Sequence, residues 1–291
     1  KMTLPELKRR GYPDDIAIGS LAGAGTLGLL IPPSIIMIVY GVAAEVSIAQ
    51  LFMAGVLPGM LLASLFSGYL VYWALRNPTL VPPADAPMRF MQKVRESRHL
   101  IPVLLLIVAV LGSIYAGIAT ATEAAAVGVV GALVLSAAQG SLNWQTFKDS
   151  LLGGTRLYCM IALILAGAAF LTLSMGYIGL PRHLAEWIAT LGLTQWQLLL
   201  ALAIFYIVLG CFLDGISMVV LTIGVVMPTV VKAGIDPLWF GIFIVLVVEM
   251  AQITPPVGFN LFVLQGMTGR EIGWIARVTL PFFFCMALAI V

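Results

Sequence analysis

The chain alternates long apolar blocks with short polar connections. One block, residues 51–75, has no charged residue in 25 positions, enough for an α-helix to cross about 30 Å of hydrocarbon. The blocks are continuously apolar rather than alternating, which favours helices over the strands of a membrane barrel. The pattern predicts an all-α polytopic membrane protein with apolar blocks at residues 16–31, 34–45, 51–75, 99–118, 122–138, 151–175, 195–213, 216–233, 237–253, 257–268 and 271–291, and a short amphipathic interfacial helix at 181–191.

Paired prolines interrupt two of these blocks. Pro32 and Pro33 stand inside an apolar run that carries no charge from residue 16 to residue 44, and Pro255 and Pro256 interrupt a second run. Proline lacks a backbone N–H and breaks a helix. Lipid tolerates the freed polar groups only where they line a cavity or bind something. We therefore predict two broken helices whose breaks take part in function.

An internal repeat relates the two breaks. A shift of 223 residues places Pro228, Gly234, Pro255, Pro256 and Pro281 on Pro5, Gly11, Pro32, Pro33 and Pro58. Almost every matched residue shapes the backbone. The basic run at residues 8–10 places the first turn in the cytoplasm, whereas counting the crossings places the second turn outside. The sequence therefore predicts an inverted repeat with re-entrant hairpins and broken helices, the architecture of secondary transporters.

The repeat divides the chain into four segments. Residues 1–75 hold the end of a first hairpin, a broken helix and the following span; residues 76–98 form a cytoplasmic basic loop; residues 99–194 hold scaffold-type spans and the interfacial helix; and residues 195–291 hold the second hairpin, its broken helix and a last span. Most of the second copy before residue 223 has no counterpart in the first. We therefore expect roughly 120 further residues at the N-terminus, including the other limb and the tip of the first hairpin.

Composition narrows the function class. Hydrophobic residues make up 61% of the chain and charged residues 10%, and the net charge of +2 gives no reason to expect nucleic acid as a partner. The sequence lacks a Walker loop, a GxSxG elbow and an HExxH motif, so we expect no enzyme activity and no cofactor. Its three cysteines show no metal or disulfide spacing and are expected to pack in lipid or in the core.

Candidate site residues gather at the breaks and at the bend of the predicted second hairpin. Freed carbonyl oxygens suit a hard cation such as sodium, and the N-terminus of a half-helix suits a carboxylate. Asp214 lies in an apolar block, where an unpaired charge costs about 3 kcal/mol at the bilayer centre. The predicted sodium ligands are Gly28, Asp214, Ser217 and Thr254, and the wider set for substrate or ion is Thr26, Gly28, Pro32, Ser34, Asp214, Gly215, Ser217, Thr254, Pro255 and Gly258.

Two further acids have less specific interpretations. Glu249 lies one turn before the second break and is equally well explained as a site residue or as a structural partner. Glu123 completes a Thr-x-x-Glu capping box with Thr120, which predicts the start of a helix rather than a site.

At these residues the sequence resembles a known family. The stretches GTLGLLIPPSIIMIVYG, SIAQLFMAGVLPG, ATATEAAAVG, FLDGIS and GIDPLWFGI…ITPPVGFNLFV resemble the large membrane subunit (M, or DctM-type) of tripartite ATP-independent periplasmic (TRAP) transporters. The resemblance covers nearly the whole chain. It implies sodium-driven import of an organic anion, such as a C4-dicarboxylate or a sialic acid, through the bacterial inner membrane. It also implies a small membrane subunit Q, a periplasmic binding protein P, and an elevator mechanism in which a transport domain slides against a scaffold.

Other functions remain open from the residues alone. The first is an ion-coupled symporter of another inverted-repeat family, which would share the architecture and work without a binding protein. A channel is disfavoured because interrupted helices replace the expected polar stripes. A membrane-embedded enzyme would need a cluster of His, Asp or metal ligands, which the sequence does not show.

Overall fold

The chain folds entirely into helices over the residues that the structure describes. The computed structural model describes residues 3–83, 92, 97, 100–255 and 258–290, and this part contains thirteen helices and no strand. Five helices are long and apolar enough to cross a membrane, or six if one bent pair counts as a single span. The predicted class, an all-α polytopic membrane protein, is confirmed.

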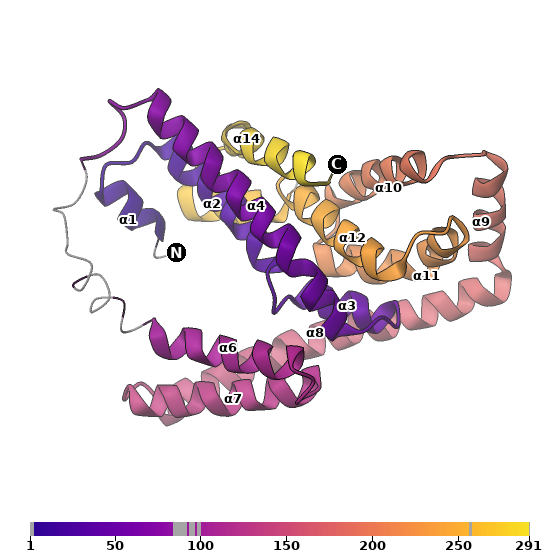
Figure 1. The fold of residues 1–291 in the computed structure, drawn as a ribbon, viewed down its shortest axis with the longest axis horizontal. Helices are drawn as coiled ribbons and strands as arrows, with labels where there is room; N and C mark the ends of the chain where they lie inside the picture. The colour runs from indigo at the N-terminus through magenta and orange to yellow at the C-terminus, as the bar shows by residue number, and fades with distance from the viewer. Residues whose placement is uncertain (1–2, 84–91, 93–96, 98–99, 256–257, 291) are drawn as a thin grey trace. The chain divides into compact units, whose positions relative to one another are not determined.

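The helix boundaries follow the predicted blocks closely (Figure 1). In chain order the helices are α1 (Thr3–Arg9), α2 (Asp14–Leu30), α3 (Ile35–Ala43), α4 (Ile48–Arg76), α6 (Ile101–Tyr115), α7 (Ala121–Ala138), α8 (Trp144–Ile178), α9 (Leu180–Thr190), α10 (Gln195–Gly210), α11 (Gly215–Lys232), α12 (Pro237–Gln252), α13 (Phe259–Thr268) and α14 (Ile272–Ile290). Most of the basic loop, together with Pro256, lies outside the described residues.

The helices group into two compact units. The first unit comprises Lys1–Pro82 and Ile164–Val291, and the second comprises Pro83–Leu163. The first unit contains both breaks and the second hairpin. The four segments predicted from the sequence are defined by the repeat rather than by compactness, and they stay a prediction.

Both predicted breaks are present. The first apolar run ends a helix at Leu30, resumes at Ile35 and bends by 41° between α2 and α3. The second run ends at Gln252 and resumes at Phe259. Pro32 and Pro33 cannot donate a backbone hydrogen bond. The helical hydrogen bonds of α2 therefore end at the break that the sequence predicted.

The two copies of the repeat share their turns as well as their breaks. Gly11 and Gly234 both have positive φ, 84° and 74°, which glycine adopts at little cost. The N–H of Gly11 donates to the carbonyl of Lys8, and that of Gly234 donates to the carbonyl of Val231, again 223 residues on. Helices α2 and α12 then begin at equivalent positions. The repeat is therefore a repeat of backbone conformation.

The two broken helices run in opposite directions. The hydroxyl of Tyr40, near the end of α3, donates to the carbonyl of Pro237, the first residue of α12, at 2.5 Å. At the other end, Arg270 follows α13 and forms an ion pair of 2.8 Å with Asp14, the first residue of α2. The start of each broken helix thus lies beside the end of the other. This antiparallel arrangement is the one that an inverted repeat requires.

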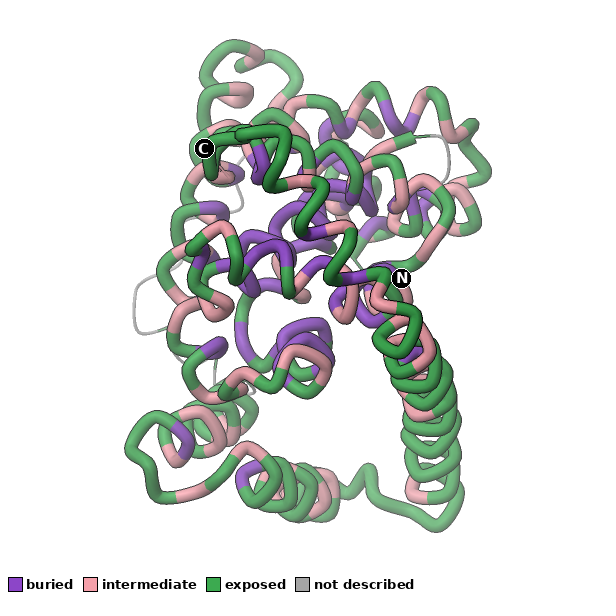
Figure 2. The backbone as a smooth tube through the Cα atoms, turned by 90° about the vertical axis from the view of Figure 1, so that its right-hand side faces the viewer, coloured by how far each residue is buried: buried purple, intermediate pink, exposed green. Residues whose placement is uncertain are grey.

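The packing between helices also follows the repeat, because each packed pair has an equivalent pair in which the two copies are interchanged. Helix α2 packs against α14 as α12 packs against α4, and α3 packs against α12 as α13 packs against α2. Glycines allow the close approach of α14: an added Cβ at Gly19 would lie 2.5 Å from the carbonyl oxygen of Val278, and one at Gly23 would lie 2.5 Å from the Phe282 ring. Every residue of α12 from Phe240 to Gln252 is buried, and buried positions are purple in Figure 2.

The second unit is built around α6, α7 and the first half of α8. The predicted capping box starts α7: the Thr120 hydroxyl accepts from the Glu123 N–H at 3.3 Å, and the Glu123 carboxylate accepts from the Thr120 N–H at 2.8 Å. Glu123 is therefore a structural residue, as expected. Most apolar side chains of these helices are exposed, which is the normal state of a helix that faces lipid.

Candidate functional site

The predicted hairpin bend is a tight turn between α10 and α11, which we call the hairpin tip (residues 210–217). Asp214 caps α11 by accepting the N–H groups of Ile216 and Ser217 at 3.1 and 3.2 Å. The Ser217 hydroxyl donates to the other carboxylate oxygen at 2.5 Å. The structure therefore brings Asp214 and Ser217 together as predicted. It also gives the carboxylate a capping role that the sequence did not assign.

The hairpin tip lies directly against the second break. The thiol of Cys211 donates to the carbonyl of Pro255 at 3.4 Å. Gly210 packs so closely on α12 that an added Cβ would lie 2.3 Å from the Cβ of Ala251. The sequence assigned Cys211 to lipid or core packing. Its position one residue after Gly210, within the predicted bend, could have indicated from the sequence that it lies at the hairpin tip.

Gly215 connects the tip to both broken helices. A Cβ at this position would lie 2.6 Å from the amide nitrogen of Gln252, 2.8 Å from Val248 and 3.0 Å from Ile36. Gln252 ends α12 and Ile36 lies in the first turn of α3. The N-termini of α11 and α3 and the C-terminus of α12 therefore meet at Gly215.

This meeting of helix ends creates a site of mixed polarity. A helix N-terminus carries a partial positive charge and unpaired N–H groups, and a helix C-terminus carries a partial negative charge and unpaired carbonyls. The N-terminus of α3 favours an anion, the N-terminus of α11 already holds the Asp214 carboxylate, and the C-terminus of α12 favours a cation. The arrangement suits a carboxylate that binds together with a cation.

At the first break, Ser34 replaces part of the lost hydrogen bonding. Its buried hydroxyl donates to the carbonyl of Leu29, whose helical partner would have been Pro33, and accepts the N–H of Met37 at 3.2 Å as the cap of α3. The carbonyl of Gly28 is different, because its helical donor position is occupied by Pro32. Gly28 therefore offers a carbonyl without a helical donor, as the sequence predicted.

At the second break, Thr254 and Gly258 form a compact turn. The Thr254 N–H donates to the carbonyl of Ala251 at 3.1 Å and its hydroxyl donates to the carbonyl of Met250 at 2.7 Å. The Gly258 N–H donates back to the carbonyl of Thr254 at 3.1 Å. A Cβ on Gly258 would lie 2.6 Å from the carbonyl oxygen of Gln252, so only glycine fits here.

One predicted site residue faces elsewhere. Thr26 is buried, its hydroxyl donates to the carbonyl of Gly23 at 2.7 Å, and it lies 3.9 Å from the sulfur of Met286 on α14. Neither of these two hydrogen bonds involves the hairpin tip. Its role in binding stays a prediction, as does that of the other nine candidates.

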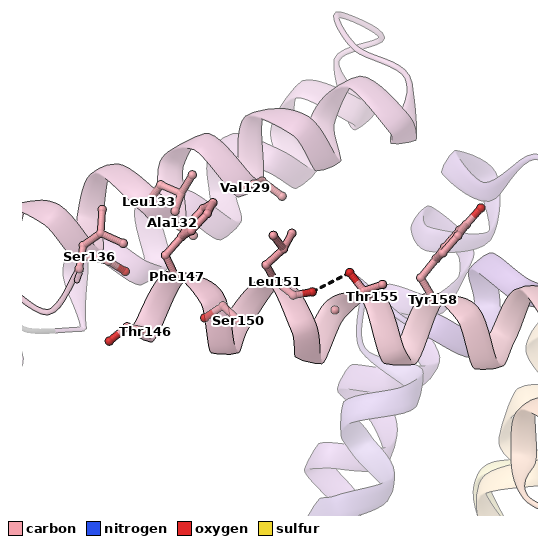
Figure 3. Close-up of a pocket in the computed structure, with 12 residues that line it drawn as sticks. Val129, Ala132, Leu133, Ser136, Thr146, Phe147, Ser150, Leu151, Thr155 and Tyr158 are labelled. Carbon is pink, nitrogen blue, oxygen red and sulfur yellow. Dashed lines mark hydrogen bonds between the residues drawn. The ribbon is translucent and has the colours of Figure 1, made fainter. Parts of the chain in front are cut away.

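A cavity of about 550 Å³ lies in the second unit, between α7 and the start of α8 (Figure 3). Its wall is mainly apolar, with Val129, Leu133 and Leu151 among its lining residues, and the Thr155 hydroxyl is bonded to the Leu151 carbonyl at 2.8 Å. None of its lining residues is charged.

Comparisons with known proteins identify relatives over the whole chain. Residues 1–291 match the family model described as "Tripartite ATP-independent periplasmic transporter, DctM component". The chain is 35% identical over 284 residues to the C4-dicarboxylate TRAP transporter large permease protein DctM of Pseudomonas aeruginosa, covering 97% of this chain and 66% of that protein. It is 33% identical over 288 residues to the ectoine/5-hydroxyectoine TRAP transporter large permease protein UehC of Ruegeria pomeroyi, covering 97% and 65%.

A third relative joins two components in one chain. The isethionate TRAP transporter permease protein DctMQ of Oleidesulfovibrio alaskensis is 32% identical over 289 residues, covering 98% of this chain and 45% of that protein. The chain thus spans about two thirds of the length of the single-component relatives and less than half of the DctMQ protein. The family match over every residue agrees with the broken helices and the hairpin tip, and the chain belongs to the DctM-component family of tripartite ATP-independent periplasmic transporters.

Proposed function

We propose that this protein takes part in sodium-coupled secondary uptake of a small organic anion, delivered by a periplasmic binding protein. The observation that carries the proposal is the meeting of two helix N-termini and one helix C-terminus at Gly215. A substrate carboxylate would bind the N-terminal N–H groups of α3. Sodium would bind nearby oxygen atoms, with candidates in the Gly28 carbonyl, Asp214, Ser217 and Thr254.

The substrate class follows from this polarity and from the relatives. The names of the relatives include C4-dicarboxylate, isethionate and ectoine, and all three are small molecules with an acidic group. We propose a carboxylate or a similar organic anion for this protein too. Membership of a family of transporter permeases supports transport rather than catalysis.

We further propose that the hairpin and the two broken helices move as one block, in an elevator-type cycle in the bacterial inner membrane. These elements belong to one compact unit and meet through buried contacts, so they are suited to move together. The proposed partners are a small membrane subunit and a periplasmic binding protein. The DctMQ relative, whose name joins two components, supports the first of them.

The first prediction tests this function in proteoliposomes. The full-length protein, reconstituted with its membrane subunit and binding protein, is expected to accumulate the organic anion only under an inward sodium gradient. A potassium gradient of the same size is the control. Uptake that persists without the binding protein would instead favour a stand-alone ion-coupled symporter, and uptake that is indifferent to sodium would contradict the proposed coupling.

The second prediction separates charge from capping at Asp214. Serine and asparagine cap helices about as well as aspartate, whereas alanine costs about 1 kcal/mol. We therefore expect Asp214→Ser and Asp214→Asn to unfold at nearly the wild-type temperature, with Asp214→Ala lower. If the carboxylate binds sodium, both neutral caps should raise the sodium concentration for half-maximal uptake by about tenfold, equivalent to ~1.4 kcal/mol. Wild-type sodium dependence in Asp214→Ser would restrict Asp214 to capping.

A further inference from the structure

Glu249 is an acidic side chain near the C-terminal end of α12, a helix that is buried along most of its length. It lies on α12 within the continuously buried run that ends at Gln252, and its exposed fraction is 0%. Neither carboxyl oxygen has a hydrogen-bond partner among the described residues. The residues before and after it, Val248 and Met250, are apolar.

An unpaired carboxylate in such a place is energetically unfavourable. Even in the membrane-insertion scale, a charged acid at the centre of a span costs about 3 kcal/mol, and burial without a partner or hydrogen bonds costs several. The other buried polar side chains left without partners, those of Thr229 and Asn260, are uncharged. Glu249 must therefore be neutralised by a bound proton or by a bound cation.

The surroundings contain no counter-charge for Glu249 among the described residues. The titratable or charged side chains on and at the ends of α12 and of the helices that pack against it are Asp14, Asp15, Tyr40, Tyr69, Tyr72, Arg76, Tyr206, Cys211, Asp214, Lys232, Asp236, Arg270, Glu271, Arg277 and Cys285. None of them forms a hydrogen bond or an ion pair with Glu249. A sodium ion also requires several oxygen ligands, whereas a proton needs only the carboxylate itself. The geometry favours a proton.

The repeat shows that the fold does not need an acid at this position. The shift of 223 residues places Glu249 on Thr26, which is also fully buried. Thr26 satisfies its hydroxyl with the carbonyl of Gly23 in its own helix. One copy therefore holds a neutral, paired side chain and the other an unpaired acid. A buried, unpaired acid is unfavourable for folding, and Thr26 shows that the fold can avoid it at the equivalent position. Its presence at Glu249 therefore indicates a functional position.

Glu249 is also close to the element proposed to move. Val248, its neighbour in sequence, and Gln252, one turn on, both lie against Gly215 of the hairpin tip. Opening of the tip, as a local motion within the block that is proposed to move, would uncover this end of α12. Water could then reach a side chain that is fully enclosed in the present conformation.

We propose that Glu249 is a proton-binding site of the transport cycle, protonated while the hairpin tip covers the second break and deprotonated when the tip moves away. The proton comes from water on one side of the membrane, forms an O–H bond with the carboxylate, and returns to water on the other side. The step involves no oxidation or reduction. This inference rests on the proposed function, to which it adds a second coupling ion.

The first test reads the proton directly and needs no transport. Infrared spectra of the full-length protein in detergent should show the carbonyl-stretch band of a protonated carboxylic acid. The band should be lost in Glu249→Gln and kept in Glu123→Gln, a matched change at an exposed carboxylate that caps a helix. An unchanged band in Glu249→Gln would overturn the proposal even if sodium-coupled uptake were established. Should Glu249→Gln fold poorly, Glu249→Met, which removes the polar atoms altogether, serves for the same measurement.

The second test follows protons during uptake. With a pH-sensitive dye trapped in proteoliposomes of the complete transporter, each burst of substrate uptake should acidify the interior in the wild type and in Glu123→Gln. Glu249→Gln should lose this acidification. Sodium-dependent uptake without acidification in the wild type, or equal acidification in Glu249→Gln, would overturn the proposal while leaving the proposed function intact.

Discussion

Replacing Gly258 with alanine is expected to abolish uptake by the complete transporter. The new Cβ would lie 2.6 Å from the carbonyl oxygen of Gln252 and 2.9 Å from that of Thr254. Both atoms belong to the backbone, so no side-chain rotation can make room. The second break would have to change its path, and with it the carbonyl groups proposed to bind the cation. Overpacking of this kind costs about 1–3 kcal/mol in folding free energy.

The matched control for this change is Gly266→Ala on the same helix, α13. Among the described atoms, none lies within 4 Å of a Cβ at Gly266. This variant should therefore retain both uptake and thermal stability. Initial uptake rates and unfolding temperatures should be measured for both variants. The comparison distinguishes a steric effect at Gly258 from a general sensitivity of α13 to replacement of glycine by alanine. Normal uptake by Gly258→Ala would contradict the geometry of the break.

Replacing Gly215 with leucine is expected to have the second large effect. Its neighbours are the ends of the Gln252 and Ile36 side chains and a methyl group of Val248, at 2.6, 3.0 and 2.8 Å from an added Cβ. A single methyl group could be accommodated by small movements of these side chains. A leucine could not, and it would hold the hairpin tip away from both broken helices. We expect uptake to fall by tenfold or more, equivalent to at least ~1.4 kcal/mol, with Gly215→Ala intermediate.

The control for Gly215 is Gly167→Leu on α8, where the described part of the chain places no atom within 4 Å of an added Cβ. Uptake by Gly167→Leu should match the wild type. If the tip does not seal against the breaks during transport, Gly215→Leu will transport normally. That result would remove the observation on which the proposed function depends.

Much of the secondary structure could be predicted from local chemistry. The break before Ile35 follows from the missing N–H groups of the prolines, and the start of α7 follows from its capping box. The start of α8 was predicted too late, at residue 151 instead of 144, because the polar residues of its first turns suggested a loop. The side chain of Asn143, which accepts the N–H of Thr146 at 2.8 Å, was the missed signal for the helix start.

The candidate site was less accessible to sequence reasoning. Its members could be named by type, since carboxylates, hydroxyls and freed carbonyls stand out in an apolar chain. Gln252 was named from the sequence only as a polar group beside the second break, and Cys211 was not selected as a site residue, although the structure places both at the hairpin tip. Their roles depend on contacts with residues far away along the chain. Sequence spacing alone does not specify such contacts.

The sequence by itself determined where the helices break and that the breaks recur in two copies, because proline and glycine act on the backbone at their own positions. Charge and the count of crossings also predicted that the copies run in opposite directions, and contacts such as the Tyr40–Pro237 hydrogen bond in the tertiary structure agree with this. Only the tertiary structure decided how the site is assembled. It alone brought the hairpin tip to both breaks and enclosed Glu249 without a partner. These features arise from packing between segments that are from 44 to 197 residues apart, and burial belongs to the assembled helices rather than to any local stretch.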